Sequence, residues 1–186
     1  ATMLAAGNST VAGATAASVG GATVTAAQAA SLVAKYTAAV FNDASLVISD
    51  TATNLAAMSA EVAAEANSIT VSSGTATVAE AVALDAFAAT DATSVNVSDT
   101  MANLTAGASD AATLAILGAQ NGIALSNASS VEDILALNAL LAGSGGAQTA
   151  IAKGYTVTDT YANLAGELQI TEVVDFAGTV NVTDAI

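Results

Sequence analysis

The sequence of 186 residues contains no cysteine, proline, tryptophan or histidine. Without cysteine the chain forms no disulfide and performs no thiol chemistry, so cysteine usage does not indicate an oxidising compartment. Without proline it has no Pro-rich linker and lacks the strongest helix breaker. Aromatic residues are limited to three Phe and three Tyr. The hydrophobic core must therefore be built from Val, Ile, Leu and Ala.

Basic residues are almost missing as well. Lys35 and Lys153 are the only basic residues, against sixteen acidic residues, and the formal net charge is −14. Such a chain cannot neutralise phosphates, which excludes nucleic acids and anionic membrane surfaces as partners. No apolar run reaches the roughly eighteen residues of a spanning helix, so we expect no membrane insertion. Residues 1–4 carry no basic residue before an apolar run and do not resemble a signal peptide.

The lack of His and Cys also argues against catalysis. Only carboxylates, hydroxyls and two lysines remain as acids, bases or nucleophiles. A glycosidase could work with two carboxylates. However, the acidic residues fall at expected helix starts and surface faces, and aromatic platforms for a sugar are missing. We predict that the protein is not an enzyme and has neither catalytic nor cofactor-binding residues.

What the chain does contain is a repeat. A branched apolar residue in a short β-like run, followed by Ser or Thr and a helix start, recurs at steps of 24, 23, 26, 28, 32 and 25 residues. A unit of this length cannot bury its own apolar face, so consecutive units must stack. We predict strands at each anchor and helices starting near residues 26, 52, 78, 101, 130 and 161. The anchors are Val24, Ile48, Val71, Val97, Leu125, Val157 and Val182.

Two types of helix start alternate along the chain. The first type has capping-box spacing, in which a hydroxyl residue is followed three positions later by Glu or Gln. The second type opens with an Asp-Thr pair and carries Asn in place of Glu or Gln. The true repeat is therefore a pair of βα units. The predicted caps are Thr25, Thr77 with Glu80, and Ser129 with Glu132 for the first type, and Asp50-Thr51, Asp99-Thr100 and Asp159-Thr160 for the second.

Short strands joined by helices of this length favour parallel pairing, which needs a connection of about a dozen residues. We predict an α/β fold, a solenoid-like stack of about six to seven βα units with a parallel sheet. A compact doubly wound parallel sheet is the alternative, because sequence spacing does not fix strand order. We expect a cap or docking segment at residues 1–21, the repeat domain at 22–165, and a strand-rich assembly segment at 166–186.

The alternating motifs resemble the tandem repeats of very large secreted bacterial surface proteins, both adhesin-like and surface-layer-like. The resemblance covers about residues 22–165. It rests on the segments 50–55, 99–104, 159–164 and 77–81. It implies extracellular structural material and no catalytic residues. The Gly-Gly-x-Gly-x-Asp calcium repeats that often accompany such regions are not present in this sequence.

The regularly spaced Asp50, Asp99 and Asp159 are also candidate calcium ligands. One carboxylate per pair of units falls short of the six to eight oxygens that calcium takes. Capping of helix N-termini explains the same residues through bonds to free N–H groups. We therefore interpret them as structural caps and expect no obligatory cofactor, with calcium as the alternative.

These observations predict a structural protein of the bacterial cell surface, a building block of a surface layer, sheath, filament or adhesin stalk. Its partners would be further copies of itself or neighbouring repeats of a longer chain. Two apolar runs near the C-terminus, with Leu168 and Ile170 in one and Val180 and Val182 in the other, are the expected assembly residues. The alternative is a calcium-dependent module that binds a carbohydrate or a host ligand.

Overall fold

The computed structural model describes residues 21–40, 46–87, 95–147, 150–165 and 173–184. It has an α/β fold in which all paired strands run parallel, as predicted. The strands are β1 (Thr23–Val24), β2 (Val47–Asp50), β3 (Ser68–Val71), β4 (Asn96–Asp99), β5 (Gly122–Leu125), β6 (Thr156–Asp159) and β7 (Thr179–Val182). The chain divides into two compact units, residues 1–74 with 83–93, and residues 75–82 with 94–186.

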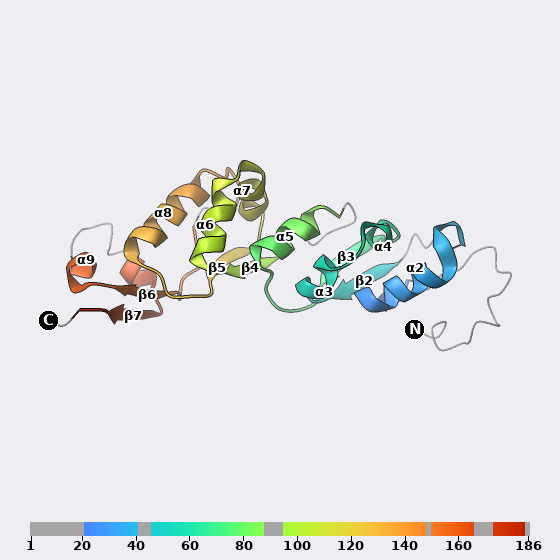
Figure 1. Ribbon diagram of the computed structural model, residues 1–186, viewed down its shortest axis with the longest axis horizontal. Helices are drawn as coiled ribbons and strands as arrows, with labels where there is room; N and C mark the ends of the chain where they lie inside the picture. The colour runs from blue at the N-terminus through green and yellow to red at the C-terminus, as the bar shows by residue number, and fades with distance from the viewer. Residues whose placement is uncertain (1–20, 41–45, 88–94, 148–149, 166–172, 185–186) are drawn as a thin grey trace. The chain divides into compact units, whose positions relative to one another are not determined.

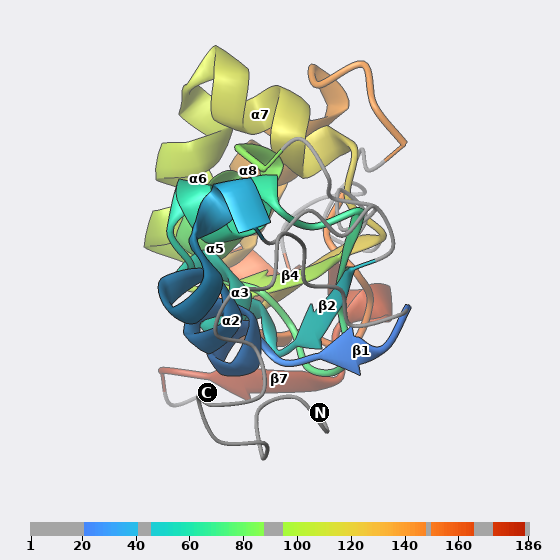
Figure 2. The same ribbon diagram turned by 90° about the vertical axis from the view of Figure 1, so that its right-hand side faces the viewer.

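The first unit is built on the sheet β1-β2-β3, in which strand order follows chain order. Helices α2 (Ala26–Val40), α3 (Ala52–Ala56) and α4 (Ala60–Ala64) connect these strands. In Figure 2, α2 and α3 lie on one side of this unit, and β1 and β2 lie on the other. Because each connection contains helix, neighbouring strands can pair in parallel. The core of this unit includes Leu32 from α2 and Leu55 from α3, both almost fully buried.

The second unit contains two parallel pairs, β4-β5 and β6-β7. Single bridges extend both pairs, because Ala76 pairs with Val97 of β4, and Ser129 pairs with Val157 of β6. Figure 1 shows α6 and α8 side by side in this unit. Its helices are the start of α5 (Val78–Asp85), then α6 (Met101–Ser109), α7 (Ala111–Gly118), α8 (Val131–Ala142) and α9 (Tyr161–Ala165).

All seven predicted anchors lie in strands, but they are not all equivalent. The strand register forms three rows of three residues, each running across neighbouring segments. In every row, the residue contributed by β3, β5 or β7 lies two positions before the predicted anchor. Apolar residues occupy both positions of each of these strands, so the sequence pattern fitted either one. The rows are Val24-Ile48-Ile69, Ala76-Val97-Ile123 and Ser129-Val157-Val180.

Five of the predicted helix starts agree with α2, α3, α5, α6 and α9, and the sixth helix, α8, begins one residue later, at Val131. Two of the connections between strands contain a pair of helices, where one helix was expected. Ser59 caps α4 after a break behind α3, and Asp110 caps α7 directly behind α6. In both cases a side chain that binds a free backbone N–H allows a new helix to begin.

Several expectations fall on residues outside the described ranges. The predicted cap or docking segment lies almost wholly within residues 1–20, and the run with Leu168 and Ile170 lies within 166–172. Within the expected C-terminal strand-rich segment, β7 is present and residues 173–176 are helical. Across the described ranges, no helix combines the length and apolar character that crossing a bilayer would require.

Candidate functional site

The strands β2, β4 and β6 all end in Asp, and these three carboxylates make the same set of hydrogen bonds. In Asp99, Oδ1 accepts from the backbone N–H of Thr100 and from the side-chain amide of Asn103, both at 2.8 Å. Its Oδ2 accepts from the N–H of Val78, the first residue of the preceding helix α5, at 3.0 Å. The carboxylate therefore stabilises the start of its own helix and that of the helix before it.

Asp50 and Asp159 repeat this arrangement in detail. Asp50 accepts from Thr51 N–H and Asn54 amide, each at 2.8 Å, and from Ala26 N–H at 3.1 Å. Asp159 accepts from Thr160 N–H at 2.8 Å, Asn163 amide at 2.7 Å and Val131 N–H at 3.1 Å. Ala26 and Val131 are the first residues of α2 and α8. Each Asp thus connects a βα unit to the one before it.

The register of the strands explains this connection. Ala76 pairs with Val97, so the position of Val78 falls opposite Asp99 when the same register is continued by two residues. The separation of 21 residues is the same for the bridge and for the hydrogen bond. Helix α5 therefore starts directly beside the end of β4, and the N–H of its first residue points to the Asp99 side chain.

Residues that follow β5 and β7 accept this bond from a different position. Asn127, two residues beyond β5, accepts through Oδ1 from the N–H of Met101, the first residue of α6, at 2.9 Å. Asp184, two residues beyond β7, accepts from the N–H of Tyr161 at the start of α9. Neither residue was among the predicted caps. Each is a polar residue two positions after a strand that does not end in Asp, and this spacing is visible in the sequence.

The hydrogen bonds hold the strand-end carboxylates in the charged form. Burial of Asp99 and Asp159 opposes ionisation, but their N–H and amide donors outweigh it and lower the pKa of both side chains below the ordinary value. For Asp50, the bond from Asn54 is the largest cause of a lowered pKa, followed by the bond from Thr51. All three groups therefore favour the folded state most strongly when they are ionised.

The hydroxyl caps follow the predicted pattern with one exception. Thr25 with Gln28 and Thr77 with Glu80 form reciprocal capping boxes. Thr51, Thr100 and Thr160 each accept from the N–H of the Asn three residues later, at 3.3, 3.3 and 3.2 Å. The side-chain amides of these Asn residues donate to the Asp four residues earlier.

The exception is the predicted cap pair Ser129 and Glu132, which is wrong by one residue. Ser130 is the N-cap of α8, and its hydroxyl accepts from Asp133 N–H at 3.1 Å. Ser129 instead occupies a strand position opposite Val157, where its side chain is buried. Each of the two consecutive serines is followed three positions later by an acidic residue, Glu132 or Asp133, and the pairing of Ser129 with β6 leaves Ser130 as the cap.

The predicted assembly residues Val180 and Val182 lie in β7 and are 40% and 48% exposed. Val180 pairs with Val157, which is fully buried. The residues that correspond to Val180 in the other two rows, Ile69 and Ile123, are also fully buried. Among the described residues, β7 pairs only with β6, so its other edge has open backbone donors and acceptors.

The calcium hypothesis for Asp50, Asp99 and Asp159 gains no support from the geometry. Both oxygens of each carboxylate already accept hydrogen bonds from N–H groups. Within the described ranges, no three acidic side chains gather closely enough to hold a metal ion. The donor set around each Asp is that of a helix cap.

Comparison with known proteins found no matching family model, no similar curated protein and no similar solved structure.

Proposed function

We propose that this chain is a non-enzymatic extracellular structural protein, a building block of a bacterial surface layer, sheath, filament or adhesin stalk. Its βα units would form a solenoid-like stack, and the same stacking would join one molecule to the next, head to tail. The repeated strand-end caps support this proposal, because each Asp connects two consecutive units at a place set by the strand register.

The observation that carries the proposal is the exposure of Val180. The residues at the corresponding place in the other two rows, Ile69 of β3 and Ile123 of β5, are fully buried, whereas Val180 of β7 is 40% exposed. Val182, also on β7, is 48% exposed. An added unit would bury both side chains and pair with the open edge, as neighbouring repeats do within a repeat stack.

A second edge is available for this contact. Among the described residues, β1 pairs only with β2. Adding β1 of one molecule to β7 of another in parallel joins two different surfaces, so the contact is heterologous and generates an open polymer instead of a closed dimer. The net charge of −14 opposes the approach of two copies. We therefore expect association to increase with salt, which screens this repulsion.

The test is sedimentation of the full chain over a range of protein and NaCl concentrations. The wild type should form larger species as both increase. Val180→Lys should prevent this, because a charged side chain at an open strand edge disfavours pairing. Val82→Lys is the matched control, since Val82 is 37% exposed and belongs to α5 instead of β7. It introduces the same charge and should leave association unchanged.

A chain that stays monomeric under all these conditions would contradict assembly through β7, and a stalk segment of a longer protein would then be the better account. Calcium provides the remaining comparison. We expect calcium to act only as added ionic strength. A large increase in the unfolding temperature at low millimolar calcium, without an equal effect of magnesium, would favour the ion-dependent binding module.

A further inference from the structure

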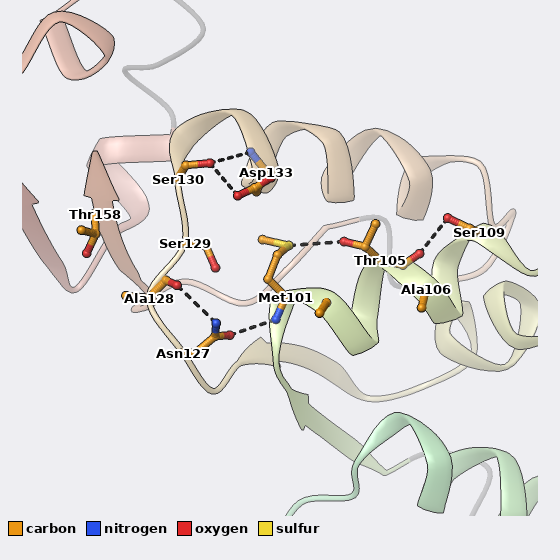
Figure 3. A pocket seen from close by; sticks show the side chains of 11 residues that line it. Met101, Thr105, Ala106, Ser109, Asn127, Ala128, Ser129, Ser130, Asp133 and Thr158 are labelled. Atoms are coloured by element: carbon orange, nitrogen blue, oxygen red, sulfur yellow. Dashed lines mark hydrogen bonds between the residues drawn. The ribbon is translucent and has the colours of Figure 1, made fainter. Parts of the chain in front are cut away.

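A groove with a volume of about 840 Å³ lies between α6 and α8 of the second unit. Figure 3 shows that α6 provides one wall and α8 the other, and that the segment between β5 and α8 runs along the end of the groove. Met101 and Ala106 line it from α6, and Asp133 lines it from α8. Ser129 lies at the inner end of the groove and Thr158 of β6 lies nearby.

The Ser129 hydroxyl is the unusual group in this groove. The side chain is only 6% exposed, and its oxygen has no hydrogen-bond partner in the described part of the chain. Its backbone is fully engaged, because its N–H donates to Thr156 at 3.1 Å and its C=O accepts from Thr158 at 3.0 Å. The residue is thus fixed in place while its hydroxyl stays unpaired, which is costly for a buried polar group.

The two equivalent positions show that the fold does not require a hydroxyl here. Ser129 begins the third row of the strand register, and Val24 and Ala76 begin the other two. Both of these residues are apolar and buried, at 2% and 0% exposure. A serine replaces an apolar residue only in the row that borders the groove. Because the unpaired hydroxyl occurs, among the described residues, only beside the groove, we infer that it bonds a ligand that enters the groove.

The remaining lining determines the chemistry of that ligand. Asp133 contributes a carboxylate whose Oδ2 accepts from the Ser130 hydroxyl at 2.7 Å, and its Oδ1 has no bond to another described residue. This charge and the overall charge of −14 disfavour an anion. The groove contains a single carboxylate, which is too few ligands for a cation. Met101 and Ala106 add apolar surface.

We propose that this groove binds a neutral saccharide of one or two rings. The Ser129 hydroxyl would bond a sugar hydroxyl at the inner end. The Asp133 carboxylate would accept bonds from hydroxyls on neighbouring carbons, and Met101 with Ala106 would contact the C–H face of the ring. A peptide fits less well, because both edges of β6 are already paired, with β7 and with Ser129. No open strand edge is therefore available in the groove for its backbone.

The experiment is an NMR titration of the full chain with four neutral disaccharides, cellobiose, mannobiose, lactose and diacetylchitobiose. At least one should bind and shift the amide signals around Ser129 and Met101. Ser129→Ala should weaken that binding about tenfold, equivalent to about 1.4 kcal/mol. The same variant should be as stable as the wild type or more stable, because it removes an unpaired buried hydroxyl. Loss of binding then cannot be attributed to unfolding.

Two further variants complete the design. Ala76→Ser places a hydroxyl at the equivalent position of the second row, outside the groove lining, and should leave saccharide binding unchanged. Digalacturonic acid should bind the wild type at least about fivefold more weakly than the best neutral disaccharide, because of the carboxylate charge. Asp133→Asn should reduce this discrimination.

Three results would overturn the proposal. The first is that none of the four disaccharides binds at about 20 mM, a concentration that detects the weak affinities expected of an open groove. The second is that Ser129→Ala binds as well as the wild type. The third is that neutral Ala/Ser tripeptides shift the same signals while the saccharides do not, which would assign the groove to a peptide.

Discussion

Asp99 accepts a hydrogen bond of 3.0 Å from the backbone N–H of Val78, a residue 21 positions earlier in the chain. The acceptor ends a strand and the donor begins the helix of the preceding βα unit. The other oxygen of Asp99 simultaneously holds the start of its own helix. One carboxylate therefore accepts hydrogen bonds from the starts of two consecutive helix-bearing units, and the same relation recurs at Asp50 and Asp159.

The first prediction concerns this connection. Asp99→Asn should lower the free energy of unfolding by about 2 kcal/mol, because an NH₂ group replaces an oxygen that accepts an N–H bond in a buried position. Asp85→Asn removes the same charge from an exposed helix position. It should change stability by less than about 0.5 kcal/mol. Urea unfolding measures both values, and equal midpoints for the two variants would contradict the role of Asp99.

The second prediction concerns the hydroxyl caps. Thr77→Ala and Thr100→Ala should each cost about 1 kcal/mol, because each leaves an N–H at a helix start without its acceptor. Thr77 caps α5 and Thr100 caps α6, so the two variants sample both types of helix start. The exposed Thr75 precedes Thr77 by two residues and is the control. Thermal unfolding should rank Thr75→Ala close to the wild type, and a loss as large as that of Thr77→Ala would argue against specific capping.

The third prediction concerns acid. The pKa of Asp99 is lowered in the folded protein, because its three donors outweigh the opposing effect of burial. In the unfolded chain the pKa returns to about 3.9. The stabilisation is therefore complete above that value and is lost as the pH falls through the lower pKa of the folded state. The difference in stability between the wild type and Asp99→Asn should be constant above about pH 5 and shrink below about pH 4.

Urea unfolding at a series of pH values measures this difference directly. Protonation of the many other acidic residues relieves repulsion equally in the wild type and in Asp99→Asn. Taking the difference between the two proteins removes this general effect. A difference that stays constant down to about pH 2 would show that the Asp99 bonds do not depend on its charge.

The fourth prediction concerns close packing before β7. A Cβ added to Gly178 would lie 2.6 Å from the carbonyl oxygen of Gly154. Backbone atoms cannot move away as easily as a side chain, so Gly178→Ala should destabilise the protein by about 2 kcal/mol. Gly143→Ala, at the end of α8 with right-handed helical backbone angles, should cost less than about 0.5 kcal/mol. Calorimetric unfolding distinguishes these outcomes, and equal effects would contradict the predicted clash.

The sequence alone determined the local structure of this protein. Branched residues such as Ile48 and Val157 define short strands, and hydroxyls such as Thr25 and Thr100 define helix starts, because both signals act over a few neighbouring residues. The parallel pairing followed from connections long enough to contain a helix. The alternation of two unit types also predicted that strand-end carboxylates cap helices, although not that each carboxylate caps the preceding helix as well.

Only the tertiary structure decided the register between strands. It selects Ile69, Ile123 and Val180 over residues two positions later, a choice that hydrophobicity could not make because both positions are apolar. The pairing of Ser129 with Val157 of β6 places Ser129 in a buried row beside the groove, although the sequence predicted it as a helix cap. It also leaves Val180 exposed although its equivalents are buried. Each of these depends on contacts between residues more than twenty positions apart, where a local pattern carries no information.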